Sequence, residues 1–193
     1  MLPQLESARL TVRLARPGMQ EAMARFLAEN FPGHLDRWSP PAAPAHFTAG
    51  FWAERLAASV EEFQADRSVR FVLHPRGDDA IIGTCNYTHI VRGAFHACNL
   101  GYQIARDHEG RGLMVEALRA TNEFMFEMMR LHRIMANYRP ENARSEAVLR
   151  RLGFTREGVA RDYLFIDGAW RDHVLTSLTH PAFDAAWLAQ APG

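Results

Sequence analysis

The chain has 193 residues, of which 48% are hydrophobic and 23% are charged. This length and composition are typical of one globular domain with a sizeable core, and they speak against a two-domain chain. The 22 basic and 22 acidic residues balance, so no overall field attracts the chain to nucleic acid or to an acidic membrane. All the basic residues are arginine, which excludes a lysine Schiff base and leaves guanidinium groups, backbone amides and helix N-termini to hold a phosphate.

The two cysteines, Cys85 and Cys98, have no cysteine or histidine near them at zinc-ligand spacing and are too few for a secreted disulfide framework. We expect both to be reduced, small, partly buried residues, and we expect no metal site. The N-terminal residues MLPQLESARLTVRL contain no long apolar run, and no segment approaches the roughly twenty apolar residues of a spanning helix. The sequence therefore predicts a soluble, cytoplasmic protein.

The first half of the chain reads as strand, helix, loop, helix and three strands. Alternating apolar residues predict a strand over 9–15, and a helical pattern follows over 16–31. The four prolines in 32–44 predict an exposed loop that shapes a pocket. A second helix is expected from about 47 to 66. The next segments have the β-rich composition of strands, namely 68–74, 78–91 and 95–105.

The second half reads as helix, strand, helix and hairpin. Apolar residues repeat at three and four from Leu113 to Met129, which predicts a long helix with a methionine-rich packing face. Three further elements follow, a strand over 132–138, a helix over 141–154 and a hairpin around Asp167 and Gly168. This order predicts an α/β (α+β) fold with a mixed central sheet and helices on both faces. We place the domain at residues 8–180 and expect residues 181–193 to form a poorly ordered tail.

The sequence GRG at residues 110–112 lies between a predicted strand and a predicted helix. A dinucleotide-binding loop needs a third glycine where Val115 stands, and a Walker loop needs a lysine, so neither fits. Two interpretations remain. The glycines either bring the backbone close to a pyrophosphate at the helix N-terminus or form a plain turn into the helix.

Several stretches around this loop resemble the GNAT superfamily of N-acetyltransferases, namely VRGAFHACNLGYQI, GLMVEAL, HRIMANY, ENARS and DGAWRDHVLT. Within the superfamily, the chain is most similar to the RimJ-like members of the RimJ/RimL-type ribosomal-protein N-acetyltransferases. The similarity covers nearly the whole chain and is densest from Ile81 to Leu178. It implies acetyl-CoA as donor and a sheet that splays open beside the strand 100–104.

The resemblance also implies which residues hold the donor. The pyrophosphate is expected on the amides of residues 109–114, with the pantetheine arm beside the strand 100–104. The superfamily often has Gln or Arg at the position where this chain has Asp107. In this chain the arginine, Arg106, stands one residue earlier. Main-chain amides do most of the binding in such a loop, so the site remains. The expected donor-binding residues are Tyr102, Gln103, Ile104, Arg106, Glu109, Gly110, Arg111, Gly112, Leu113, Met114, Asn142 and Ser145.

Acetyl transfer needs a neutral amine, stabilisation of an oxyanion and a proton for the leaving thiolate. A backbone N–H of the strand 100–103 is expected to polarise the thioester carbonyl. The resemblance places Asn142 on the cofactor arm and Ser145 near its sulfur, which makes Ser145 the expected proton donor. Asn142 is alternatively only the N-cap of its helix. Tyr138 and Tyr163 are the alternative donors.

The general base and the acceptor side are less well defined by the sequence. RimL-like relatives have a glutamate at the position matched here to Leu164. Asp162 lies two residues earlier and is expected on the same strand face. It either takes the role of that glutamate through water or is a solvated structural residue. His96 and His108 are further titratable candidates. An extended peptide is expected to contact Trp38, Asn86, His96, Asn99 and Tyr163.

The expected activity is acetylation of the N-terminal α-amine of a protein by direct attack on the thioester. By resemblance, the protein that accepts the acetyl group is expected to be a small-subunit ribosomal protein whose first residue is alanine or a similar small residue. One alternative is an acetyltransferase for a small amine such as a polyamine, an aminoglycoside or an amino acid, and another is a non-catalytic acyl-CoA-binding module. We expect a monomer or a homodimer.

Overall fold

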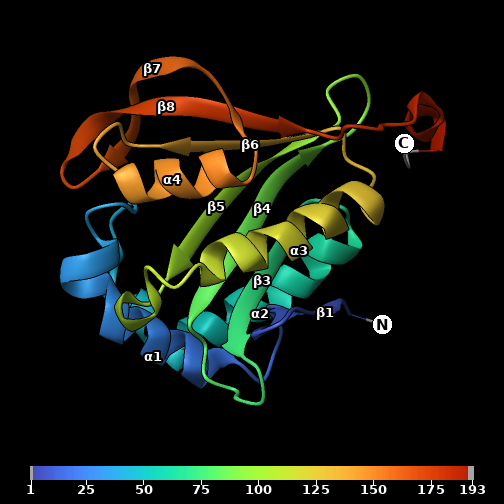
Figure 1. The fold of residues 1–193 in the computed structure, drawn as a ribbon. Coiled ribbons are helices and arrows are strands. Elements are labelled where there is room, and N and C mark those ends of the chain that lie inside the picture. The colour runs from blue at the N-terminus through green and yellow to red at the C-terminus, as the bar shows by residue number, and fades with distance from the viewer. Residues whose placement is uncertain (1, 191–193) are drawn as a thin grey trace.

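The computed structural model describes residues 2–190 and shows an eight-stranded sheet with helices on both of its faces (Figure 1). The strands are β1 Gln4–Glu6, β2 Leu10–Leu14, β3 Val69–Pro75, β4 Gly83–Val91, β5 Ala97–Ile104, β6 Arg133–Tyr138, β7 Thr155–Ile166 and β8 Ala169–Thr179. They lie in the order β1-β2-β3-β4-β5-β6-β8-β7. β5 and β6 are parallel, and the other neighbouring strands of the described chain are antiparallel.

The α-helices are α1 Gln20–Asn30, α2 Ala49–Gln64, α3 Leu113–Glu127 and α4 Ala143–Arg151. α3 and α4 lie in front of the sheet in Figure 1, whereas α1 and α2 lie behind it. Apolar residues at helical spacing bury Leu118 and Met125 of α3 completely, in a core shared with Phe71 and Tyr87 of the sheet. The predicted mixed sheet between helices is confirmed.

Three segments differ from the sequence-based boundaries. β1 was not expected, because three residues are too short to show an alternating pattern. The strand expected from residue 78 begins at Gly83, since the chain turns first and the Asp78 N–H donates to Pro75 O at 3.0 Å. The loop 32–44, expected to be exposed, buries His34 because its Nε2 lies 3.1 Å from Ile104 O. Short helical turns lie at its two ends, Phe31–Leu35 and Pro44–Phe47.

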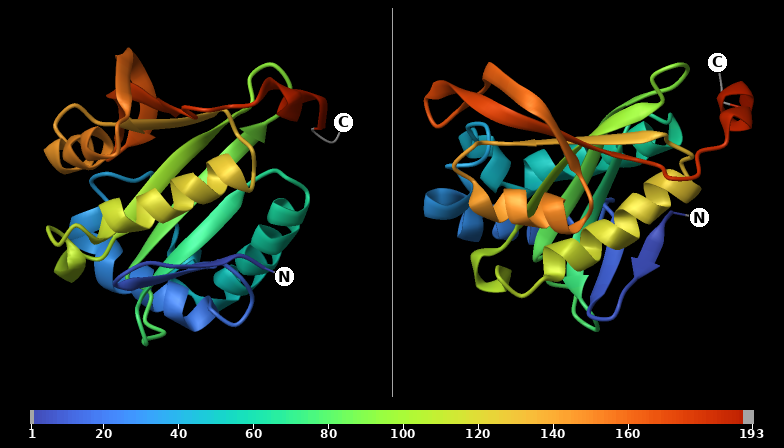
Figure 2. Two further views of the ribbon diagram at one scale, coloured as in Figure 1. Left: turned by 45° about the vertical axis from the view of Figure 1, so that its right-hand side comes forward. Right: turned by 45° about the horizontal axis from the view of Figure 1, so that its top comes forward.

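The sheet splays open between β5 and β6. The two strands pair from Ala97 with Arg133 to Leu100 with Ala136 and no further. β5 continues along β4 as far as Ile104, whereas β6 continues along β8 as far as Tyr138. The two halves of the sheet therefore diverge, as the views in Figure 2 show.

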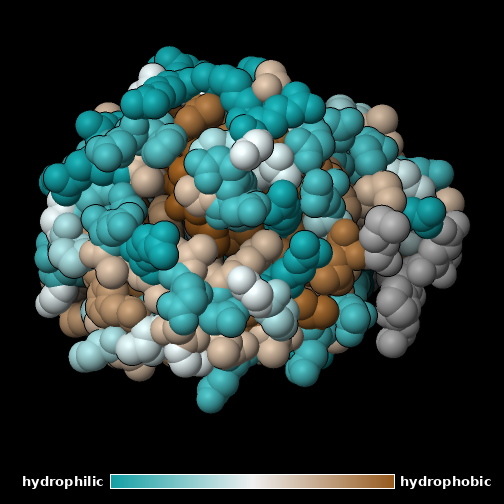
Figure 3. All heavy atoms as spheres, turned by 90° about the horizontal axis from the view of Figure 1, so that it is seen from below, coloured by the Kyte–Doolittle hydropathy of each residue, from teal (hydrophilic) through white to brown (hydrophobic). Residues whose placement is uncertain are grey.

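The described part of the C-terminal segment ends in a short 3-10 helix, Ala185–Gln190. The Phe183 ring lies 5.5 Å from that of His96 and 5.1 Å from that of His132, so this part of the predicted tail packs on the domain. Residues 191–193 lie outside the described residues. The face shown in Figure 3 is mostly hydrophilic around a central group of apolar side chains. No helix in the described residues is long and apolar enough to cross a membrane.

Candidate active site

A cavity of about 510 Å³ lies where β5 and β6 diverge. It is lined by the second half of β5, the end of β6, the start of α4, the loop after α1 and the β7–β8 hairpin. The structure brings together at this cavity most of the residues that the sequence pointed to, namely Trp38, Asn86, Asn99, Tyr102, Gln103, Ile104, Glu109, Met114, Tyr138, Asn142, Ser145 and Tyr163. Arg106 lines a second hollow, which shares Glu109 and Asn142 with the first.

The glycine loop leads directly into α3. Gly110 and Gly112 have φ values of 71° and 74°, in the left-handed region that favours glycine. Gly112 is the N-cap residue of α3, and no side chain caps the helix there. The first N–H groups of α3 therefore lack a side-chain acceptor from the cap, and a Cβ added to Gly110 would meet no atom of the described residues within 4 Å. An open helix N-terminus with this backbone fits an anionic pyrophosphate.

Glu109 and Arg111 flank the first glycine of this loop. The Arg9 guanidinium donates to Arg111 O at 2.9 Å and is paired with Glu116 in the first turn of α3, so the loop is tied to the start of β2. The Arg111 side chain itself is exposed. On the other side of the loop, Glu109 is ion-paired with Arg144 of α4. The loop residues 110–113 thus lie next to the cavity but are not among the residues that line it.

Ser145 and Tyr102 form a hydroxyl pair inside the cavity. Ser145 Oγ, in the first turn of α4, lies 2.7 Å from Tyr102 Oη on β5. The Tyr102 hydroxyl is also 3.3 Å from Ser145 O, to which it donates. Burial raises the pKa of Tyr102, while its hydrogen bond with Ser145 lowers it. The tyrosine therefore keeps its proton at neutral pH, and the pair is a connected source of hydroxyl protons. The sequence pointed to both residues without indicating that they touch.

Asn142 caps α4, as one of the two interpretations expected. Its Oδ1 accepts the Ser145 N–H at 3.0 Å, and this bond fixes the first turn that carries Ser145. Asn142 and Ser145 also both line the cavity, so capping and contact with a bound molecule are compatible.

Of the alternative proton donors, Tyr138 is the more enclosed. It ends β6 and is buried, and its pKa is raised first by burial and then by the Glu146 carboxylate. Tyr163 lies on β7 and is 41% exposed. The thiols are poor candidates for a nucleophile, because burial raises the pKa of Cys85 and raises that of Cys98 to about 12.

Asp162 does not reach the cavity, which corrects the expectation based on strand alternation. In the β7–β8 pair, Ala160 faces His173 and Leu164 faces Arg171, so residues 161–163 of β7 bulge against one residue of β8. The bulge interrupts the period of two on which the expectation relied. Asp162 is exposed with a φ of 47°, and its N–H donates to Asp172 Oδ1 at 3.0 Å.

The two histidines named from the sequence also lie away from the cavity lining. His96 precedes β5 at the end far from the splay, with Nδ1 3.2 Å from Gly93 O and its ring under Phe183. Burial lowers its pKa. His96 is not among the residues that line the cavity, so the predicted contact with a peptide there has no support from this structure. His108 lies in the turn Arg106–His108 before the glycine loop and does not line the cavity either.

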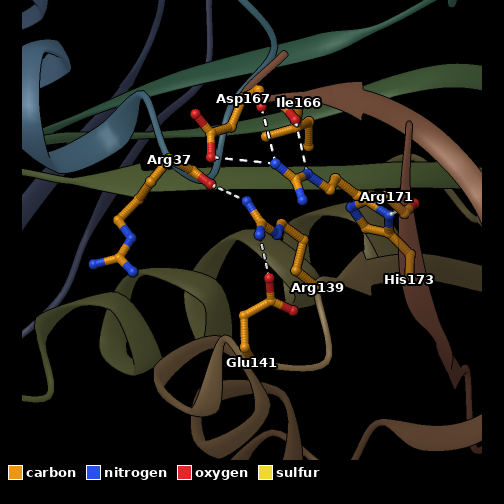
Figure 4. Close-up of polar contacts among 7 residues, drawn as sticks. All are labelled: Arg37, Arg139, Glu141, Ile166, Asp167, Arg171 and His173. Atoms are coloured by element: carbon orange, nitrogen blue, oxygen red, sulfur yellow. Dashed lines mark hydrogen bonds and ion pairs between the residues drawn. The ribbon is translucent and has the colours of Figure 1, made fainter. Parts of the chain in front are cut away.

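Sequence reasoning missed several residues that line the cavity, above all His173 of β8 and Arg139 after β6. Figure 4 shows Arg139 between two loops, where it donates to Arg37 O at 2.7 Å and contacts Glu141. Its guanidinium also lies 5.5 Å from the Trp38 ring centroid. The loop after α1 is thus fastened to the loop after β6 across the splay. No local pattern indicated these contacts, although His173 lies within the DGAWRDHVLT stretch.

The splayed sheet, with a glycine loop at a helix N-terminus beside it, defines the class of this protein. Residues 9–155 match the family model described as acetyltransferase (GNAT) domain, and the chain belongs to this family of acetyltransferases. It is 44% identical to the [ribosomal protein uS5]-alanine N-acetyltransferase of Escherichia coli (strain K12) over 178 residues, which cover 92% of this chain and 91% of the relative.

Two solved structures have the same fold over nearly their full length. The ribosomal-protein-S5-alanine acetyltransferase of Vibrio fischeri superposes with a TM-score of 0.90 at 37% identity and covers 94% of this chain and 99% of its own. Mycobacterium smegmatis RimJ in complex with CoA-disulfide superposes with a TM-score of 0.84 at 30% identity and covers 98% and 93%. The expected family, the enzyme class and acetyl-CoA as donor are confirmed.

Proposed function

We propose that this acetyltransferase modifies the N-terminal α-amine of a ribosomal protein whose first residue is alanine or a similar small residue. The observation that carries the proposal is the 44% identity, over 92% of the chain, to an enzyme named for alanine acetylation of ribosomal protein uS5. The cavity at the splay supports it, because its lining combines donor-side and acceptor-side residues in one space. The proposed place of action is the cytoplasm, where such a substrate is made.

The donor side follows from the open strand edge and the helix N-terminus. After Leu100, β5 has no strand partner on its β6 side among the described residues, so main-chain groups of residues 101–103 on that side can bind an extended arm, whereas Ile104 O is already bonded to His34 Nε2. The amides of residues 109–114 take the pyrophosphate, and Arg106 and Arg111 add charge at its solvent side. When bound, acetyl-CoA supplies the thioester that the amine attacks.

The proton for the leaving thiolate is assigned to Ser145. The Asn142 cap holds the backbone N–H of Ser145, and the Ser145 hydroxyl is hydrogen-bonded to Tyr102, which replaces the proton that Ser145 gives up. Tyr138 is the second candidate because it is enclosed and protonated at neutral pH. Backbone N–H groups of residues 100–103 stabilise the oxyanion, since the strand edge is rigid and lies along the cavity.

The test is an acceptor panel. The protein is incubated with acetyl-CoA and peptides that begin with alanine, serine or a bulky residue, with an N-acetylated alanine peptide as blocked control, and with a polyamine and an aminoglycoside. Released thiol and product mass are measured. Fastest turnover on the free alanine peptide, with none on the blocked one, is expected. Turnover on the small amines alone would establish the first alternative, and tight donor binding without turnover would establish the second.

A Ser145→Ala variant tests the proton donor. We expect kcat to fall about 10²-fold with little change in the KM for acetyl-CoA, because general acid catalysis is typically worth that much. Tyr138→Phe is the matched comparison, since it removes one hydroxyl from the other side of the same cavity. A larger loss in Tyr138→Phe than in Ser145→Ala would reassign the role to the tyrosine.

A further inference from the structure

We propose that His173 is the general base, taking a proton from the attacking amine at its Nε2 atom. The inference rests on the proposed function and names the group that the acceptor side of the reaction requires. The reaction needs a base because an α-amine is largely protonated at neutral pH and only the neutral form attacks a carbonyl carbon.

The fold holds His173 firmly at the acceptor side of the cavity. It lies on β8, one residue before Val174, which pairs with Tyr138 at the end of β6. The side chain is 2% exposed, lines the cavity, and has its ring centroid 5.6 Å from that of Tyr163. It is therefore a buried titratable group whose contact with the outside runs through the cavity.

A single hydrogen bond determines which ring nitrogen accepts. His173 Nδ1 lies 3.0 Å from Arg171 O, and the close-up in Figure 4 shows the two residues side by side. A carbonyl oxygen only accepts, so Nδ1 must carry the proton. In the neutral ring Nε2 is then the acceptor, and the ring is held in the tautomer that a base needs.

The other charged or titratable groups of the cavity do not fill this role. Burial raises the pKa of Tyr138, so its hydroxyl keeps its proton; Tyr163 offers only a phenol hydroxyl, and the Arg139 guanidinium has no acceptor atom. Glu109 is the one carboxylate among the described lining residues, and it belongs to the glycine loop, where Arg144 neutralises it. Two further histidines line the cavity, His34, which is bonded to Ile104 O, and the exposed His89 on β4.

The ammonium group loses two protons during the transfer, one to His173 and one to the Ser145–Tyr102 pair. His173 Nε2 takes one proton from the incoming ammonium group, and the amine nitrogen then forms the C–N bond with the acetyl carbonyl carbon. As the C–S bond breaks, the thiolate takes a proton from the Ser145 hydroxyl. The second ammonium proton, lost by the adduct, restores the Ser145–Tyr102 pair, and His173 releases its proton to solvent. One amide, one thiol and one proton result, and no other reactant is needed.

The experiment compares His173→Asn with wild type. Asparagine places an N–H donor near Arg171 O but has no Nε2 acceptor. We measure kcat/KM for an alanine-starting peptide from pH 5.5 to 9, together with the Kd for acetyl-CoA. We expect wild-type kcat/KM to fall on the acid side of neutrality, because a charged imidazole cannot act as a base. In His173→Asn, we expect a loss of about 10²–10⁴-fold at pH 7, an acid limb moved up to the pKa of the free α-amine at about 7.7–8.0, and a Kd within about twofold of wild type. Added imidazole should restore part of the rate.

His89→Asn is the matched control, because it removes the exposed histidine from the same cavity. We expect it to retain the acid limb, whatever its effect on KM. A His173→Asn enzyme whose acid limb stays at the wild-type pH, or that loses rate equally at every pH without imidazole rescue, would overturn the proposal.

If His173→Asn fails to bind acetyl-CoA, the wild-type, His89→Asn and His34→Gln profiles decide. An acid limb that all three share, below the pKa of the free α-amine at about 7.7–8.0, supports His173, and its absence from wild type overturns the proposal. Lack of turnover by wild type on every acceptor refutes the proposed function instead, so the two failures are distinguishable.

Discussion

Gly110 allows the backbone interpretation of the donor loop to be tested apart from protein stability. Its φ of 71° is left-handed, and within residues 2–190 a Cβ there would meet no atom closer than 4 Å. A Gly110→Ala substitution therefore causes backbone strain without a steric clash. Left-handed backbone costs an L-residue about 1–2 kcal/mol, and relief of the strain would turn the loop amides away from their direction. If all of that free energy is lost from binding, the Kd for acetyl-CoA rises about 5- to 30-fold.

Gly77 provides the control because it has the same conformation in another place. Its φ is 79°, a Cβ would also meet no atom within 4 Å, and it lies in the turn between β3 and β4. Gly77→Ala should lower the free energy of unfolding by about 1 kcal/mol and leave the Kd unchanged. Asparagine and aspartate both tolerate a left-handed backbone, so comparing Gly110→Asn with Gly110→Asp separates the effect of backbone strain on the Kd from the effect of charge. The aspartate variant should bind about tenfold more weakly than the asparagine variant, through repulsion of the pyrophosphate.

The assay is calorimetric titration with acetyl-CoA, paired with urea unfolding of each variant. Equal Kd values for wild type, Gly110→Ala and Gly110→Asp, with stability lost as in Gly77→Ala, would show that the glycines form only a turn into α3. The pyrophosphate would then have to bind elsewhere.

Three further predictions concern single side chains. Glu62 accepts hydrogen bonds, the strongest from Arg55, that lower its pKa from 4.5 to about 2. The stabilisation by the ionised carboxylate is present above pH 4.5 and is lost as the pH falls toward 2. In urea unfolding, Glu62→Gln should therefore lower the free energy of unfolding by about 2 kcal/mol at pH 7 and by little at pH 2. A loss equal at both pH values would contradict this. Asn142→Asp keeps an acceptor for the cap of α4, so we expect the stability of the protein to be unchanged. If Asn142 also contacts the donor, the KM for acetyl-CoA should rise, whereas an unchanged KM would show that Asn142 serves as a cap alone. Tyr102→Phe removes the hydroxyl bonded to Ser145 and should lower kcat about tenfold at constant Kd for the donor; full activity would remove Tyr102 from the proton path.

Much of the donor side was predictable because its signals are local. The two loop glycines, the helix beginning at Leu113 and the ENARS turn each depend on residues a few positions apart, and backbone geometry gives such patterns their meaning. The hairpin at Asp167 and Gly168 is of the same kind, with φ values of 52° and 69° as its turn requires. Comparable reasoning failed for Asp162, because a bulge in β7 cancels the alternation on which it relied.

Apart from the three-residue strand β1, the sequence by itself determined the elements, their order and the chemistry available at the glycine loop, since these follow from short-range periodicity and backbone preference. Only the tertiary structure decided which side chains meet. The pairing of Tyr102 with Ser145, 43 residues apart, depends on how α4 lies beside the splay, and the place of His173 depends on the register of β8 against β6 and β7. Register and splay result from packing across the whole sheet, and no local run of residues encodes them.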